Sequence, residues 1–215
     1  MSTAQTATEI IRKRVTSPLA RLSYPYLFTP KRGKDDDPDK FCTALIFEAG
    51  VDLKPIKQIA MDVAKSRWPD APNMIRAGKL RWPFRGDAED VEEKGYPEGS
   101  TFMNVSSGDN QPGVVDAACV NVTDPNQAYA GRYVYVTLTA YTYDVKGNKG
   151  VTFGLNNVQL LQHGDRLDGR RAAADEFQVE ESAMADLSDL DEQAVEAPEA
   201  GDTTEAEDAL SDLIT

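Results

Sequence analysis

The sequence lacks most of the residues on which metal centres and hydrolytic active sites depend. Its 215 residues include one histidine, His163, and two cysteines, Cys42 and Cys119, with no C-x-x-C pair. A structural zinc site is therefore not expected. The cysteines lie far apart within apolar runs, which indicates reduced core residues of a cytosolic protein rather than a disulfide. His163 follows the last expected strand in a polar turn, so no Ser-His-Asp or Cys-His catalytic device is predicted.

Apolar runs long enough to cross a membrane are also missing. No stretch of about 18 apolar residues occurs, so we expect no membrane partner. The N-terminal segment MSTAQTATEIIRKRV is polar and lacks the apolar region of a secretory signal, which predicts a cytoplasmic protein. No G-x-x-x-x-G-K-[ST] phosphate loop is present. We predict no cofactor and no enzymatic activity.

Positive charge is absent from the C-terminal part of the chain. The net charge is −13, from 23 Lys and Arg against 36 Asp and Glu. Residues 172–215 hold 15 of these acids and no base, so they carry −15 and residues 1–171 carry +2. A segment so one-sided in charge, with Phe177 as its one aromatic residue, cannot bury enough apolar surface to fold. We expect residues 178–215 to be a disordered acidic tail.

The end of this tail differs from the rest because aliphatic residues stand among the acids. Leu210, Leu213 and Ile214 have the i, i+3, i+4 spacing of one helical face. Asp208 and Asp212 flank them. A tail that only confers solubility would need no such face, so we favour binding to a partner protein.

Residues 12–177 combine strand-like segments with turn signals, after a flexible arm at 1–11. We expect one amphipathic helix over 53–68, with Asp52 as its N-cap. The strand-like segments are 14–28, 41–47, 79–84, 101–106, 114–122, 132–144 and 151–161. Strands and helices do not alternate, which excludes a doubly wound parallel sheet. The expected fold is mainly β, an antiparallel OB-fold barrel of five or six strands with one inserted α-helix.

The segment 132–144 alternates strictly between two kinds of side chain. Val134, Val136, Leu138 and Ala140 share one face, and tyrosines and threonines occupy the other. Four exposed tyrosines on one strand face would be unusual, so either the helix and loops cover them or a ligand stacks on them.

Two basic segments without acids give the strongest indication of function. Residues 10–34 hold seven bases, and residues 71–86 hold four, interleaved with Trp82 and Phe84. Cations suit phosphates, and an unstacked base gains about 1–3 kcal/mol on an aromatic face. Core packing is an equal alternative for the two rings. The predicted nucleic-acid-binding residues are Arg12, Lys13, Arg14, Arg21, Lys31, Arg32, Lys34, Arg76, Lys79, Arg81, Trp82, Phe84, Arg85, Arg132, Tyr133, Tyr135, Tyr141, Tyr143, Lys146 and Lys149.

Acid clusters keep two alternatives open. The clusters at 35–39 and 87–90 are compatible with a metal-dependent nuclease. However, consecutive carboxylates in one loop cannot all face the same metal ion, so we favour solvated loop charges. The other alternative is an adaptor protein that acts through the acidic tail alone.

Five motifs follow one another along the chain: ARLSYPYLFTP at 20–30, PFRGD at 83–87, YPEG at 96–99, YAGRYV at 129–134 and GNKGVTFGLNNVQ at 147–159. In this order they resemble the phage-encoded single-stranded DNA-binding proteins of the OB-fold type. The likeness covers most of residues 15–177.

The resemblance implies a function as well as a fold. It implies sequence-nonspecific binding of single-stranded DNA (ssDNA) in phage replication or recombination, in the cytoplasm of the host cell. It further implies an acidic tail that contacts replication and recombination proteins. Relatives can associate into homo-oligomers on DNA, and some also bind duplex DNA.

Overall fold

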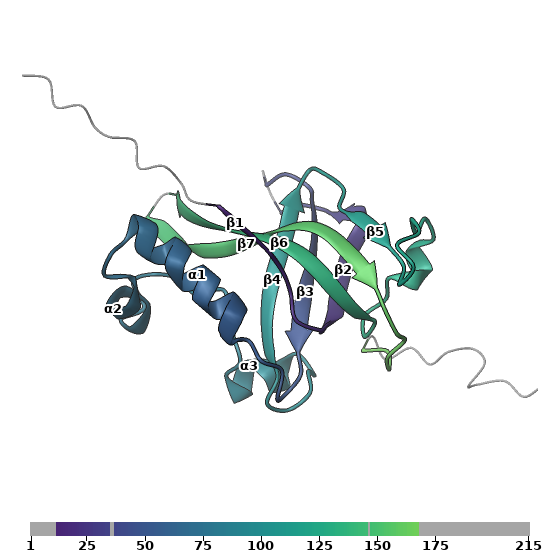
Figure 1. The fold of residues 1–215 in the computed structure, drawn as a ribbon, viewed down its shortest axis with the longest axis horizontal. Helices are drawn as coiled ribbons and strands as arrows, with labels where there is room; N and C mark the ends of the chain where they lie inside the picture. Colours follow the sequence, from purple (N-terminus) through teal and green to yellow (C-terminus); the bar gives the residue numbers. More distant parts are fainter. Residues whose placement is uncertain (1–11, 35–36, 146, 168–215) are drawn as a thin grey trace, which may run out of the picture. The chain divides into compact units, whose positions relative to one another are not determined.

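The computed structural model describes residues 12–34, 37–145 and 147–167 (Figure 1). The predicted N-terminal arm, Lys146, Phe177 and the acidic tail with its aliphatic tip lie outside the described residues. Within them, seven strands form one sheet in the order β1-β6-β2-β3-β4-β7-β5. The strands are β1 (Lys13–Thr16), β2 (Ala20–Lys31), β3 (Lys40–Phe47), β4 (Thr101–Gly108), β5 (Gly113–Val115), β6 (Tyr133–Val145) and β7 (Asn148–Leu160).

The sheet closes on itself. β6 pairs with β2 and with β7, and β7 also pairs with β4, so β2, β3, β4, β7 and β6 form a ring. A ring of five strands cannot alternate in direction throughout, and the β4–β7 pairing, Ser106 opposite Gly154, is parallel. β5 also joins β7 in parallel. The expectation of a wholly antiparallel sheet was therefore wrong.

Three α-helices occur in the described residues instead of the one expected. They are α1 (Lys54–Arg67), α2 (Ala71–Arg76) and α3 (Ala88–Glu93), and a 3₁₀ turn lies at Pro125–Gln127. The six-residue helices are shorter than two turns, so they leave no readable apolar period. Leu53 is the N-cap of α1, while the Asp52 carboxylate accepts a hydrogen bond from the Lys54 N–H at 2.9 Å.

The main core lies between α1 and the inner face of the ring. α1 buries Ile56, Ala60 and Val63 and packs against β6 and β7. The aliphatic face predicted on β6 is confirmed, since Val136 and Leu138 are fully buried. The large apolar area removed from water on this face stabilises the ring.

Two expected strands were wrong in extent. Residues 79–84 form no strand, only isolated bridges of Arg81 and Arg85. The segment 114–122 is strand only at β5, because the Asp116 carboxylate accepts the N–H groups of Ala118 and Val120 and turns the chain. Cys119 lies in this turn and is exposed, so it is not a core residue as expected.

A second, small core lies on the outward face of the ring. Side chains alternate along a strand, so Leu45 enters the main core while Ile46 points outward. Ile46, Val91, Tyr96 and Phe102 form this satellite core. It fixes α3 and the chain that follows it against the outward face of β3 and β4.

Candidate nucleic-acid interface

The outward face of β3 and β4 carries an open hollow of about 540 Å³, which we call the main groove. Its floor follows the strand register, in which Cys42 opposes Ser106 and Ala44 opposes Asn104. The other lining residues are Tyr24, Tyr26, Lys31, Lys40, Thr43, Arg85, Lys94, Tyr96, Val105 and Thr152. Strands β2, β3, β4 and β7 all contribute to it.

The charge of the main groove has one sign. Lys31, Lys40, Arg85 and Lys94 line it, and none of the described residues that line it is Asp or Glu. A concave surface lined by cations alone concentrates anions. Burial raises the pKa of the Cys42 thiol, against the opposing effect of the two nearby lysines, so the floor adds no negative charge at neutral pH.

Two tyrosines of β2 stand beside these cations. Tyr24 and Tyr26 are 64% and 36% exposed, although both lie within a strand of the main sheet. The Lys31 ammonium lies 5.8 Å from the centre of the Tyr26 ring. Exposed rings next to unneutralised cations suit a ligand that carries both flat apolar groups and negative charge.

The backbone at Tyr24 is strained. Its φ is +47°, in the left-handed region, which bulky residues rarely adopt. Pro25 follows, and a residue before proline is normally extended. Such strain costs about 1–3 kcal/mol and persists only where the surroundings impose it, most often at functional sites.

The predicted Arg81–Arg85 segment forms a second hollow of about 370 Å³, here called the Trp82 hollow. It shares Arg85, Asn104 and Thr152 with the main groove and adds Arg81, Trp82 and Tyr143. The segment is held at both ends by backbone hydrogen bonds. Arg81 N–H donates to the Lys149 carbonyl at 3.0 Å, and Arg85 N–H to the Phe102 carbonyl at 2.9 Å.

A third hollow of about 490 Å³, the Tyr141 hollow, continues from Ser106 of the main groove. Arg12 and Tyr141 line it together with Gly154. The three hollows bring Arg12, Lys31, Arg81, Trp82, Arg85, Tyr141 and Tyr143 of the predicted set to one connected surface. We call this surface the track.

The four tyrosines of β6 do not act as one group. Tyr141 and Tyr143 line the track, but Tyr135 is 41% exposed and lines none of its hollows. The Tyr133 hydroxyl donates to Glu48 at 3.0 Å. Burial raises the pKa of the Tyr133 phenol, and this hydrogen bond raises it further. The two alternatives for the four tyrosines, burial by other parts of the fold or stacking on a ligand, therefore apply to different tyrosines.

Two predicted cations hold the fold together. The Arg21 guanidinium, almost fully buried, donates to the carbonyls of Gly131 and Asp165 at 3.1 and 2.6 Å and pairs with Glu48 at 3.2 Å. Arg132 is also buried.

The partners of Arg132 belong to the C-terminal end of the described chain. It donates to the Leu161 carbonyl at 2.8 Å and lies 2.7 Å from the His163 ring nitrogens. With Arg21, Tyr129 and Tyr133, these residues form what we call the C-terminal clamp. The structure corrects the expectation for both arginines, because a polynucleotide could not reach them.

Phe84 is the other correction. It is buried in the main core, with its ring edge-on to Phe153 at 5.8 Å. Trp82 packs partly against the same core and is half-buried, 5.7 Å from Phe84. The sequence places both rings on one face, but only Trp82 borders the track.

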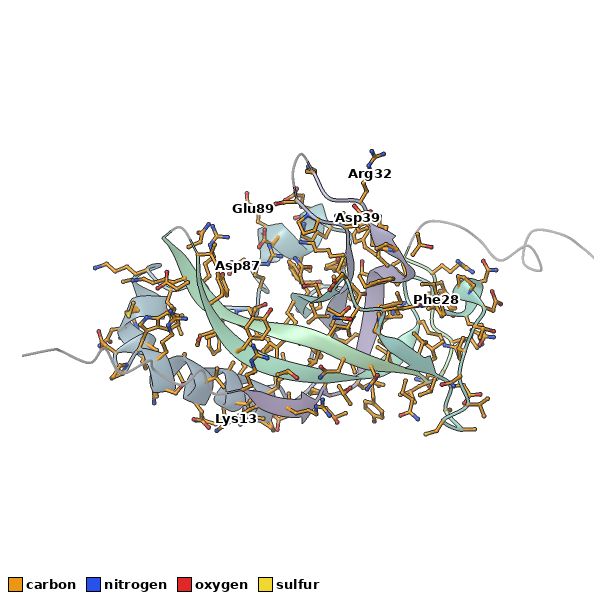
Figure 2. The ribbon with its side chains drawn as sticks, turned by 90° about the horizontal axis from the view of Figure 1, so that it is seen from above. Lys13, Phe28, Arg32, Asp39, Asp87 and Glu89 are labelled. Carbon is orange, nitrogen blue, oxygen red and sulfur yellow. The ribbon has the colours of Figure 1, made fainter. Side chains whose placement is uncertain are left out.

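The remaining predicted cations lie outside the three hollows. Lys13 pairs with Asp62 of α1 at 3.1 Å and lies far from Arg32 (Figure 2). The others are Arg14, Arg32, Lys34, Arg76, Lys79 and Lys149, all exposed or half-buried. Exposed cations of this kind still contribute to the long-range field that attracts an anion.

Sequence reasoning missed several residues of the track. Lys94 follows an acidic run, and Lys40 stands beside Asp39, so neither belongs to an acid-free block. Tyr24 and Tyr26 flank Pro25 and lie outside the predicted set, although the strand-like segment 14–28 contains them. The Y-P-Y sequence was the available signal, because proline inside a strand marks an edge or a bulge.

The acid clusters of the sequence can be compared with the described residues. Among them, no three His, Cys, Asp or Glu side chains come close enough together to hold a metal ion. Asp87 and Glu89 of the second acid cluster point outward near α3 (Figure 2), while Asp35 and Asp36 of the first lie outside the described residues. No helix in the described part is long and apolar enough to span a bilayer.

Comparisons with solved structures show the same fold in phage proteins. The ssDNA-binding protein of bacteriophage Enc34, solved in complex with ssDNA, is 20% identical with a TM-score of 0.55, over 71% of this chain and 86% of that one. Another structure of the Enc34 protein is 18% identical with a TM-score of 0.56, over 77% and 90%. The ssDNA-binding protein gp2.5 of bacteriophage T7 is 16% identical with a TM-score of 0.52, over 91% and 100%.

The sequence itself gives the family. A comparison with curated proteins finds no match. The family model described as "Enterobacter phage Enc34, ssDNA-binding protein" matches residues 12–188, which include every strand and helix described above. The chain therefore belongs to the Enc34 family of phage ssDNA-binding proteins.

Proposed function

We propose that this chain binds ssDNA along the track, without catalysis, during phage DNA replication and recombination in the host cytoplasm. The main groove carries this proposal. Four cations line it with no carboxylate, beside two exposed tyrosines. Cations neutralise the phosphates, and the rings accept unpaired bases.

The ring of five strands supports a more specific assignment of the fold. We infer that it is an OB-fold barrel, with residues 12–177 as one nucleic-acid-binding domain. The pairing of β6 with both β2 and β7 closes it, and α1 fills one side. OB-folds bind oligonucleotides on their outer surface across the middle strands, which is the position of the main groove here.

The track favours single strands over duplexes and is tolerant of sequence. Tyr24 and Tyr26 can stack only on bases released from pairing, and every base has a flat face. Association into homo-oligomers along the strand is compatible with such binding.

The acidic tail has two proposed roles. Its 13 acids carry the charge opposite to that of the cations lining the main groove, so it competes with DNA for the groove. When DNA displaces it, the tip with Leu210, Leu213 and Ile214 is free to recruit replication and recombination proteins.

Charge reversal in the main groove tests the proposed function. The full chain should bind labelled ssDNA more tightly than duplex, leave it intact with Mg²⁺, and lose affinity as salt rises, by a log–log slope of about −0.7 per neutralised phosphate. Lys40→Glu with Arg85→Glu should weaken binding about 10- to 100-fold at 50 mM salt and flatten the slope by about 1.4.

The matched control makes the same change in net charge, two cations replaced by two carboxylates, outside the track. Lys54 and Lys65 are exposed on α1, outside the track. Lys54→Glu with Lys65→Glu should therefore change the affinity far less. Equal losses in the two double variants would show that only the overall charge matters and would contradict a defined track.

A further inference from the structure

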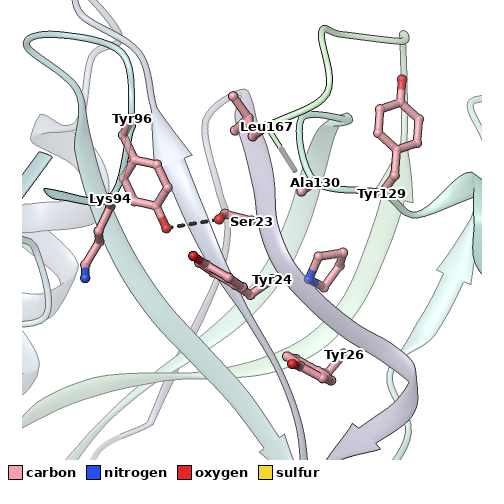
Figure 3. Close-up of a pocket in the computed structure, with 9 residues that line it drawn as sticks. Ser23, Tyr24, Tyr26, Lys94, Tyr96, Tyr129, Ala130 and Leu167 are labelled. Carbon is pink, nitrogen blue, oxygen red and sulfur yellow. Dashed lines mark hydrogen bonds between the residues drawn. The ribbon is translucent and has the colours of Figure 1, made fainter. Parts of the chain in front are cut away.

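A fourth hollow, of about 500 Å³, adjoins the main groove and shares Tyr24, Tyr26, Lys94 and Tyr96 with it; Figure 3 shows its lining residues. Four tyrosines line it, Tyr24, Tyr26, Tyr96 and Tyr129, so we call it the tyrosine pocket. Among the described residues that line it, Lys94 is the one charged side chain, and none is a carboxylate. Its volume lies within the range of about 300–1,000 Å³ in which proteins hold small organic groups.

Tyr24 forms the ridge between the two hollows because β2 carries one extra residue at this point. Ser23 pairs with Ala44 and Tyr26 pairs with Cys42, so Tyr24 and Pro25 together oppose one residue of β3. This is a β-bulge, a device that redirects a side chain out of the regular pleat. Figure 3 shows the Tyr24 ring projecting between Tyr96 and Tyr26.

Hydrogen bonds to Ser23, the residue before Tyr24, hold the strained bulge in place. The Tyr96 hydroxyl donates to the buried Ser23 hydroxyl at 3.0 Å, and the Thr43 hydroxyl donates to the Ser23 carbonyl at 3.0 Å. Tyr96 is itself fixed in the satellite core, 5.2 Å from Phe102. These contacts hold the backbone at the bulge, and so they set the direction in which the exposed Tyr24 side chain leaves β2.

The far wall of the pocket is also fixed. The Tyr129 ring stacks on the His163 ring with centroids 5.9 Å apart, and the Arg166 guanidinium lies 4.5 Å from the centre of the Tyr129 ring. Its hydroxyl donates to the Gly164 carbonyl at 3.1 Å. These contacts fix Tyr129 in the lining of the pocket.

We propose that the tyrosine pocket receives one nucleobase of the bound strand, and that the Tyr24 ring inserts between this base and its neighbour in the main groove. This rests on the proposed function and extends it by one subsite. Lys94 lines both hollows and is the cation available to the phosphate that joins the two nucleotides. A base is the favoured occupant because four aromatic rings line the pocket, and three of them, Tyr24, Tyr26 and Tyr96, also line the main groove.

The test uses the full chain and oligo(dT) of increasing length, with affinity measured by fluorescence anisotropy. Tyr24→Leu should weaken binding of a long oligonucleotide about 5- to 100-fold, and Tyr24→Phe should keep most of the affinity, because the ring matters and the hydroxyl does not. Tyr135→Leu is the matched control, since Tyr135 is exposed but lies outside the track. It should bind like the unaltered chain.

A second variant addresses the pocket alone. Ala130 lines the tyrosine pocket and not the main groove, so Ala130→Phe fills the slot and leaves the track open. The length at which affinity stops rising should fall by about one nucleotide, while shorter oligonucleotides bind as before.

The outcomes separate the two proposals. If Tyr24→Leu binds as tightly as Tyr135→Leu, or if Ala130→Phe keeps the original length dependence, the base subsite is wrong while the track stands. If the unaltered chain shows no salt-dependent binding of ssDNA, the proposed function fails as well.

Discussion

The main groove and the C-terminal clamp are built from the same residue types but use them differently. In the clamp, Arg21 lies 5.2 Å from the Tyr133 ring, and both side chains bond to Glu48. In the main groove, Lys31 lies 5.8 Å from the Tyr26 ring with no carboxylate among the lining residues.

The difference lies in the partners and not in the cation–ring pair itself. Where backbone carbonyls and a carboxylate are within reach, the pair is buried and stabilises the fold. Where they are missing, cation and ring stay accessible to a ligand that brings its own negative charge. A basic residue next to a tyrosine therefore predicts binding only where the fold supplies no acceptor.

The largest effect is expected from breaking the clamp. Arg21→Met keeps the aliphatic volume but leaves the Gly131 and Asp165 carbonyls without the Arg21 donor. It also removes the cation paired with Glu48, which keeps its hydrogen bond from Tyr133. We expect the free energy of unfolding to fall by about 2–4 kcal/mol. Urea denaturation measures this loss, and ssDNA affinity of the folded protein should change less than about twofold. A variant of unchanged stability with weakened binding would place Arg21 in the track instead.

The ridge should show the opposite behaviour. Tyr24→Gly removes the strain of a bulky residue at positive φ, which glycine adopts freely, so the free energy of unfolding should rise by about 1 kcal/mol. ssDNA affinity should nevertheless fall at least about fivefold. Thermal denaturation and anisotropy on the same preparation measure both. Loss of stability at Tyr24→Gly would mean that the ring supports the fold.

The two cysteines sharpen the comparison without any mutation. Cys42 lies in the main groove and Cys119 in an exposed turn beyond it. With ssDNA at ten times its Kd, alkylation of Cys42 should slow about tenfold, because only the free protein reacts. Cys119 should react at the same rate throughout, as peptide mass spectrometry would show. Equal protection of both would point to a different surface or to general compaction.

The smallest effect is expected from the tail. Deleting residues 178–215 removes the charge that competes for the main groove, so ssDNA binding should tighten about 2- to 10-fold at 50 mM salt. The difference should vanish near 1 M, where the screening length is about 3 Å. A salt titration of both chains decides it, and identical curves would remove the competition.

The strands that sequence predicted best are those whose pattern is decided locally. The alternation around Val136 and Leu138 gave β6, and the apolar run at 41–47 gave β3, because one buried face imposes a period of two on the side chains. The family was also predicted from the order of short motifs, and the family match confirms it.

What sequence could not predict depends on partners that are distant in the chain. Arg21 is buried because it donates a hydrogen bond to the Asp165 carbonyl, 144 residues away, and Phe84 is buried because its ring packs against Phe153. Tyr24 was missed because a single extra residue in β2 turns its side chain outward, and the alternation of side chains in the sequence does not show where a β-bulge lies. Lys94 was hidden by its acidic neighbours, although the satellite core carries it to the main groove.

The parallel pairing of β4 with β7 is the shortest pairing in the ring. β4 and β7 meet at one residue pair, Ser106 with Gly154, and both residues line hollows of the track. This single pairing closes the ring between β4 and β7. On the proposed track, DNA crosses this pairing, and we predict that bound DNA slows hydrogen exchange most at the amides beside Gly154.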